Sequence, residues 1–275
     1  MAITSFIPTV WSETLQTQLD REYIAVRNCN RDFEGDIKEK GSAVRIGRIG
    51  AISVFDYTKD TDMTSPQTLS DSAKVLTIDQ AKAFNFQIDD VDKAQSQPKL
   101  MEAAMAQAAA ALADVADKYV YSLYTEADPK NVISYDDTTP DDVLDLIIDA
   151  RRRLLNNNVN SNVPTALEVS PEVAAMIMSA KIVGATDNTE VYENGSLGKF
   201  IGFDIYVSPN IAKDEGGRHK CIARTKRAVS FAEQLNEVEA YRPESRFADA
   251  VKGLHLYGAK IVYPDEYIVI DLSLG

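Results

Sequence analysis

The sequence has few cysteines, few histidines and no long apolar run, and each scarcity narrows what the protein can be. Its two cysteines, Cys29 and Cys221, lie far apart and outside any CxxC pair. Neither a disulfide framework nor a zinc site is therefore expected, and a reducing cytosol suits the chain best. No window approaches 18 uncharged apolar residues, and the N-terminus lacks a basic region followed by an apolar one, so neither a membrane span nor a signal peptide is expected.

Basic charge is also scarce. The chain of 275 residues has 29 lysines and arginines against 42 acidic residues, which gives a net charge of −13. This excess argues against extensive binding to nucleic acid or to an anionic membrane surface. Hydrophobic residues make up 45% of the sequence, which is typical of a globular protein able to bury a sizeable core.

No motif in the sequence predicts an active site. The two histidines, His219 and His255, have no second histidine at metal-ligand spacing, and we expect a solvated loop residue and a sheet-face residue. Three carboxylates, Asp89, Asp90 and Asp92, lie together and could bind a divalent ion or do acid–base work. A solvated strand end explains them as well. The sequence thus predicts no catalytic residue, no cofactor and no metal site.

Helices and strands are mixed without the regular alternation of a doubly wound sheet, which predicts an α+β fold. The longest expected helix begins at Pro98 and runs to about Thr125, with nine alanines between positions 103 and 116. Thr139 is expected to cap a second helix that starts at Pro140 and ends near three arginines. The helix macrodipole explains these arginines, and a contact between subunits is the sharper alternative.

The segment from Arg45 to Asp90 reads as one long hairpin with apolar arms and a polar tip. Phe84, Phe86 and Ile88 alternate with polar residues, as in a half-buried strand. Two strands alone are only marginally stable in water, and an exposed apolar face marks an interaction surface. Together with an N-terminal arm that carries Trp11, this apolar hairpin predicts a subunit that binds neighbouring subunits.

This order of elements resembles the major capsid (coat) proteins of tailed bacteriophages, whose fold is shared with bacterial encapsulins. Several segments resemble sequences typical of that family: FIPTVWSETLQ, LTIDQAKAFNFQIDDVDKAQ, LEVSPEVAAMIM, GKFIGFDIYVSPNI and AEQLNEVEAYRPESRFADAVKGLHLYGAKIVYP. By this resemblance, residues 1–34 are an N-terminal arm and 35–92 the hairpin called the E-loop. Residues 95–134 and 241–275 form a P-domain with the spine helix, and 135–240 an A-domain.

The resemblance implies a major capsid protein that assembles with itself into hexamers and pentamers of an icosahedral virion shell. That shell encloses double-stranded DNA without binding it specifically, and assembles in the cytoplasm of the bacterial host. Scaffolding and portal proteins are the further partners it implies, with no membrane and no enzymatic activity. An encapsulin-like compartment is the alternative, and a metal-dependent enzyme a weaker one.

Subunit contacts are expected at residues of the arm, the hairpin and the arginine-ended helix. They are Trp11, Arg45, Ile46, Val54, Phe55, Lys59, Phe84, Phe86, Arg151 and Arg152. Some members of the family cross-link subunits through a lysine and an asparagine. Lys59, near the tip of the hairpin, is a candidate for such a bond, although an ordinary solvated lysine is the commoner case.

Overall fold

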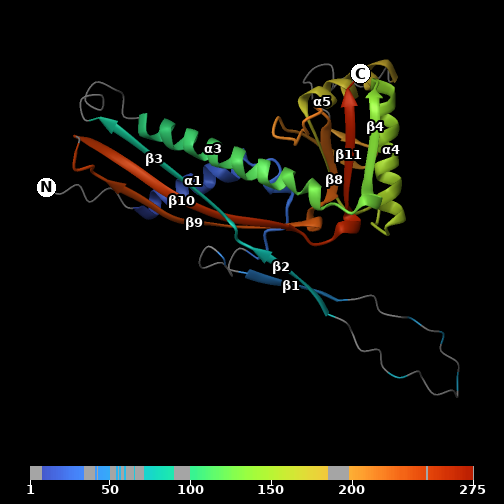
Figure 1. Ribbon diagram of the computed structural model, residues 1–275, viewed down its shortest axis with the longest axis horizontal. Helices are drawn as coiled ribbons and strands as arrows, with labels where there is room; N and C mark the ends of the chain where they lie inside the picture. Colours follow the sequence, from blue (N-terminus) through green and yellow to red (C-terminus); the bar gives the residue numbers. More distant parts are fainter. Residues whose placement is uncertain are drawn as a thin grey trace.

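The computed structural model describes residues 8–33, 41, 43–49, 54, 56, 59, 65, 71–89, 100–184, 198–245 and 247–274. These residues form three parts, which Figure 1 shows from one side. An elongated part consists of a three-stranded sheet with helices along it. A second part is built on a six-stranded sheet, and a two-stranded ribbon projects away from both.

The elongated part is an antiparallel sheet in the order β3-β10-β9. Its strands are β3 (Gln80–Asp89), β9 (Val229–Tyr241) and β10 (Ala248–Ile261). Two helices, α1 (Pro8–Glu22) and α3 (Leu100–Ser122), run beside this sheet (Figure 1). The long alanine-rich helix predicted from Pro98 is thus observed from Leu100, the first residue of it that the structure describes.

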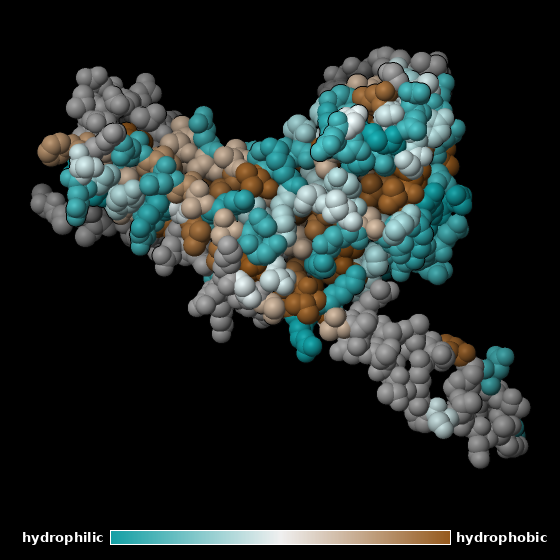
Figure 2. Space-filling view, in the orientation of Figure 1, coloured by the Kyte–Doolittle hydropathy of each residue, from teal (hydrophilic) through white to brown (hydrophobic). Residues whose placement is uncertain are grey.

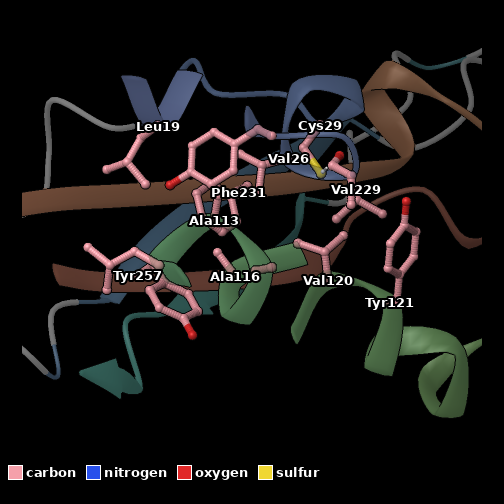
Figure 3. Packing of buried hydrophobic residues seen from close by; sticks show 14 of the residues in the cluster. Leu19, Val26, Cys29, Ala113, Ala116, Val120, Tyr121, Val229, Phe231 and Tyr257 are labelled. Atoms are coloured by element: carbon pink, nitrogen blue, oxygen red, sulfur yellow. Dashed lines mark hydrogen bonds between the residues drawn. The ribbon is translucent and has the colours of Figure 1, made fainter. Parts of the chain in front are cut away.

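The main core lies between α1, α3 and one face of this sheet. Figure 3 shows Leu19, Val26 and Cys29 of the N-terminal segment packed opposite residues of α3 and of the sheet. The buried residues of α3 in this cluster include Ala109, Ala113 and Ala116. Because alanine side chains are short, the helix lies close to its neighbours. The core also stacks the rings of Phe231 and Tyr257, whose centroids are 5.9 Å apart.

The second part contains a mixed six-stranded sheet in the order β4-β11-β8-β5-β7-β6. The strands are β4 (Val132–Thr138), β5 (Thr165–Val169), β6 (Lys199–Phe200), β7 (Phe203–Val207), β8 (His219–Thr225) and β11 (Tyr267–Leu274). Helices α4 (Pro140–Asn156) and α5 (Pro171–Gly184) contact each other and pack on the sheet through a second apolar cluster. The mixture of helices and sheets confirms the predicted α+β fold.

Helix starts follow the sequence closely. Thr139 caps α4 through a capping box, in which the Thr139 hydroxyl accepts from the Asp142 amide and the Asp142 carboxylate accepts from the Thr139 amide. α5 begins at Pro171, a residue type that suits the first turn of a helix. Short 3-10 helices connect several elements: η1 (Val26–Asn28), η3 (Leu123–Glu126), η4 (Pro129–Asn131), η5 (Lys226–Ala228) and η6 (Pro264–Glu266).

The predicted hairpin is wrong in its extent. The ribbon pairs only β1 (Ala43–Ile49) with β2 (Asp71–Thr77). After Ile78 the chain changes partner, and β3 pairs with β10 instead, with Phe86 opposite Val251. The alternation of apolar and polar residues continues through β2 and β3, because each strand packs one face on the body. The sequence therefore gives no sign that the chain changes its pairing partner here.

The domain boundaries taken from the resemblance also differ from the sheet topology. β11 was expected in the part with the spine helix, but it lies inside the six-stranded sheet between β4 and β8. Conversely, β9 was expected with the second part and pairs with β10 in the elongated sheet. Among the helices that the structure describes, none is long and apolar enough to cross a membrane.

Candidate assembly surfaces

The base of the ribbon is fixed to the body by a small apolar cluster. Ile46, Leu76 and Ile78 pack against Leu256 and Val262 of the body. Ile46 is only 5% exposed, so its predicted role as a contact between subunits is wrong. Its own chain covers it, which gives the ribbon a fixed base. Figure 2 shows apolar side chains gathered on the underside of the body where the ribbon departs.

A glycine permits the ribbon to cross the elongated sheet. At Gly258 of β10, a Cβ atom would lie 2.2 Å from the carbonyl oxygen of Thr77 and 3.1 Å from Cα of Ile78. Both neighbours are backbone atoms, so no side chain can rotate away to make room. Nearby, Lys74 Nζ donates a hydrogen bond to the Ile261 carbonyl over 2.9 Å. The direction in which the ribbon projects therefore depends on the missing side chain of Gly258.

Beyond its base, the ribbon exposes both apolar and charged residues. Val54 is 93% exposed, Val75 of β2 is 43% exposed, and Arg45 lies opposite Val75 with its side chain in solvent. Lys59 is also exposed, whereas Phe55 lies outside the described residues. The described part of the chain thus leaves Val54 almost without cover.

Phe84 and Phe86 lie on β3 and not on the ribbon. Both are half-buried, they stack with ring centroids 6.0 Å apart, and they pack against the main core. Most of their predicted intermolecular surface is therefore taken by their own subunit. A shallow depression opens beside Phe84, lined also by Ala83, Gly253 and Leu254.

The N-terminal segment is held by a carboxylate of α3. Asp117, buried on α3, accepts hydrogen bonds from the backbone amides of Ile24, Ala25 and Val26 over 2.9, 3.1 and 3.1 Å. Burial raises the pKa of Asp117 to about 6, although these three amide bonds act in the opposite direction. Trp11 belongs to α1, and its side chain lies outside the described residues.

The same segment reaches the six-stranded sheet through a buried ion pair. Arg224 of β8 donates to both oxygens of Glu168 on β5, over 3.0 and 2.8 Å, and both side chains are fully buried. Arg224 also donates to the Ala25 carbonyl, and Glu168 accepts from Asn28 Nδ2. Residues 24–28 thus connect α3 with the six-stranded sheet.

A second buried carboxylate links the segment to the elongated sheet. Glu233 of β9 accepts from Tyr23 and Arg31 over 2.5 Å each, and its Oε2 lies 2.8 Å from His255 Nε2. Burial opposes ionisation of Glu233. The hydrogen bond and the electrostatic interaction with His255, together with Tyr23 and Arg31, outweigh burial and keep the pKa of Glu233 below its ordinary value. Tyr23 and Arg31 both belong to the N-terminal segment, so this cluster holds it to the sheet.

We expect the Glu233 cluster to make the free energy of unfolding of the subunit fall on acidification. Since the pKa of Glu233 is lower in the folded chain, its contribution is complete above about pH 4.5 and is lost as the pH falls through its folded value. Glu233→Gln should cost roughly 1–3 kcal/mol near neutral pH and flatten the fall in unfolding free energy on acidification. Urea unfolding of the subunit across this range measures both effects. Glu239→Gln, on the same strand but half exposed beside Lys252, is the control and should change neither.

Arg151 and Arg152 have different environments. The side chain of Arg151 is buried inside its own subunit, where it donates to Thr165 and to the Ser161 carbonyl and lies over the ring of Phe203. Its predicted role in a subunit contact is therefore wrong. One face of α4 points into the core, and position 151 falls on that face. Arg152 points outward with its side chain 62% exposed and pairs with Asp149.

The residues considered for chemistry do not form a catalytic site in the described part of the chain. His219 was expected in a solvated loop, but it is buried at the start of β8, where Nδ1 lies 2.8 Å from Ser170 Oγ. No group of three or more potential metal ligands occurs among the described residues. The side chain of Asp89 and all of Asp90 and Asp92 lie outside them.

The described fold combines two sheets, a long helix and a ribbon that projects from the body. A family model described as a phage capsid protein matches residues 73–270, and the chain therefore belongs to that family. A comparison with curated protein sequences gives no significant match. The resemblance to phage capsid proteins noted in the sequence is thus confirmed.

Solved structures share the fold over nearly the whole chain. A structure from Mycobacterium phage Che8 is 28% identical over 90% of both chains, with a TM-score of 0.72. The capsid structure of the cyanophage P-SCSP1u is 16% identical over 90% of this chain and 86% of that one, with a TM-score of 0.68. A virus-like particle from Pyrococcus furiosus is 13% identical over 95% and 98%, with a TM-score of 0.59.

Proposed function

We propose that this chain is the major capsid protein of a tailed bacteriophage. Copies of it assemble into hexamers and pentamers and then into an icosahedral shell around double-stranded DNA. The observation that carries the proposal is the ribbon, which is attached to the body by a buried apolar cluster and leaves Val54 and Val75 exposed. In a self-assembling family, another copy of the chain is the natural cover for such an element.

Each part of the subunit then has a role in the shell. The six-stranded sheet with α4 and α5 corresponds to the A-domain, and the elongated sheet with α3 to the P-domain and its spine helix. The ribbon of β1 and β2 corresponds to the E-loop, and residues 8–33 to the arm. These assignments follow the sheet topology and replace the boundaries taken from the sequence alone.

The role is structural and not catalytic. Scaffolding and portal proteins are the expected partners during assembly in the host cytoplasm, and the virion is the final location. The net charge of −13 suits a container whose wall does not hold its DNA tightly. Contacts between subunits are individually weak, and closure of the shell sums them.

Deleting the segment that joins β1 to β2 tests the proposal. Residues 50–70 are replaced by Asn-Gly, which closes β1 and β2 with a two-residue turn because Ile49 and Asp71 are already paired. The variant should fold with unchanged secondary structure by circular dichroism and form no shells by electron microscopy, whereas the full chain forms capsomers or shells. Normal shells from the deleted chain would refute the role given to the ribbon.

An encapsulin-like compartment is a second candidate, favoured by the similarity to the Pyrococcus particle over 95% of this chain. It shares the fold but would enclose a protein. Purified shells treated with nuclease separate the two functions. Protected double-stranded DNA supports the phage capsid, while a protected protein of defined mass and no DNA supports the compartment.

A further inference from the structure

A buried histidine contacts the residue that caps α5. Ser170, directly before α5, is fully buried, and its Oγ lies 2.8 Å from Nδ1 of His219, the first residue of β8. The same Oγ accepts a hydrogen bond from the Val173 amide over 3.4 Å, and the Ser170 carbonyl accepts from the Ala174 amide over 2.9 Å. The hydroxyl that caps the first turn of α5 therefore also connects this turn to β8.

This pair of contacts requires a neutral imidazole. A serine hydroxyl has one hydrogen, and because the oxygen of Ser170 accepts from Val173, that hydrogen is available to Nδ1 of His219. Nδ1 accepts it only when the imidazole is neutral and carries its proton on Nε2. A second proton would occupy Nδ1, and the Ser170 hydrogen would lose its acceptor. In a fully buried site such a loss costs free energy.

The charges around His219 also oppose a positive imidazole. The ring lies at the N-terminus of α5, where the helix macrodipole is positive. Lys213, which forms an isolated antiparallel bridge with His219, adds a cation. Glu172 Oε2 lies 4.0 Å from Nδ1, but the same carboxylate also accepts from Lys213 Nζ over 2.8 Å. Burial and then Lys213 lower the pKa of His219, and Glu172 offsets only part of this change.

The other neighbours of the ring bring no charge toward it. On β11 the residue in register with His219 is Leu272, which is buried and apolar. Arg218 and Lys220 flank His219 in the sequence, but both donate to the same carboxylate oxygen of β11. Since side chains alternate along a strand, these two cations lie on the other face of the sheet. In the described part of the chain, the imidazole is therefore faced by one acid and one base, the Glu172–Lys213 pair.

We propose that His219 is a proton-sensitive latch on the first turn of α5. While it is neutral, it holds this turn to β8 through Ser170, and when it takes up a proton the turn opens more often. Ile177 and its apolar neighbours keep the rest of the helix on the sheet. Because the pKa of His219 is lower in the folded chain, the contribution of the latch is complete above about pH 6.5 and is lost as the pH falls through the folded value. The latch is a property of the single subunit and does not depend on the proposed assembly.

Hydrogen exchange of the full chain, followed by mass spectrometry, tests the latch. After correction for the intrinsic effect of pH, exchange at residues 172–175 should become roughly three- to tenfold faster between about pH 7.5 and pH 5. His219→Gln keeps an acceptor for the Ser170 hydroxyl but does not titrate, so its exchange should stay slow at both pH values. The first turn of α4 is the internal control. Thr139 caps it through Asp142, and hydrogen bonds from Thr139 lower the pKa of this carboxyl, so its charge is constant over this range.

Two exposed neighbours should change the acid response in opposite directions. Lys213→Gln removes the cation that opposes a positive imidazole, so the acceleration of exchange in acid should become smaller. Glu172→Gln removes the anion that favours it, so the acceleration should become larger. Both side chains are largely exposed, at 40% and 47%, so both variants should fold. Wild-type exchange that does not respond to pH, an equal response in His219→Gln, or an unchanged response in both charge variants would each overturn the latch.

Discussion

Replacing Gly258 with alanine is expected to stop assembly while leaving most of the subunit folded. The added Cβ would lie 2.2 Å from the Thr77 carbonyl oxygen, so β2 must move away from β10. That movement separates Leu76 and Ile78 from Leu256 and opens the apolar cluster at the base of the ribbon. The cost should be about 1–3 kcal/mol in unfolding free energy, as in other overpacked sites.

The effect on assembly should exceed the effect on stability. Each subunit uses its ribbon once, so a change in the direction of the ribbon is repeated at every contact in the shell. A loss of about 1.4 kcal/mol at each contact already lowers its equilibrium constant tenfold. Negative-stain electron microscopy of Gly258→Ala should therefore show subunits and no shells, while circular dichroism stays close to wild type.

Gly216→Ala is the matched control for this prediction. Gly216 lies in a loop, and an added Cβ would lie 3.3 Å from a side-chain oxygen of Asp214, a contact that a shift of a few tenths of an ångström relieves. This variant should form normal shells. A normal yield of shells from Gly258→Ala would show that the base of the ribbon tolerates the displacement. Gly258 would then not determine the direction of the ribbon.

The sequence predicted those features that depend on local rules. The cap of α4 at Thr139 and the start of α5 at Pro171 follow from residue types that stabilise a helix N-terminus. The alanine-rich helix follows from propensity. The outward Arg152 and the inward Arg151 could also have been separated, because the apolar periodicity of α4 places position 151 on its buried face.

Features that depend on contacts distant in sequence were not predictable. The break between β2 and β3 arises because β10, more than 150 residues later, pairs with β3. Nothing in the sequence around Gly258 indicates that the backbone of Thr77 passes close to it. Glu168 and Arg224 look like ordinary strand residues, since only the fold brings together their charges and the carbonyl of Ala25.

The buried ion pair between Arg224 and Glu168 provides the largest expected effect on stability. Arg224→Met removes the cation and leaves Glu168 buried without its ionic partner, with Asn28 as its remaining side-chain hydrogen-bond donor among the described residues. Breaking a buried pair in this way costs about 3–5 kcal/mol. Urea unfolding of the unassembled subunit should show this loss, and a loosened N-terminal segment should show faster amide exchange at residues 24–28.

The double variant Arg224→Met with Glu168→Leu distinguishes the cost of a lone charge from the value of the pair. Removing both charges leaves no ionised group in the core, so the double variant should be more stable than Arg224→Met alone. It should still lose stability relative to wild type, because the Ala25 carbonyl and the Asn28 amide lose their partners. If the double variant is as unstable as the single one, these hydrogen bonds and not the ion pair hold the N-terminal segment to the six-stranded sheet.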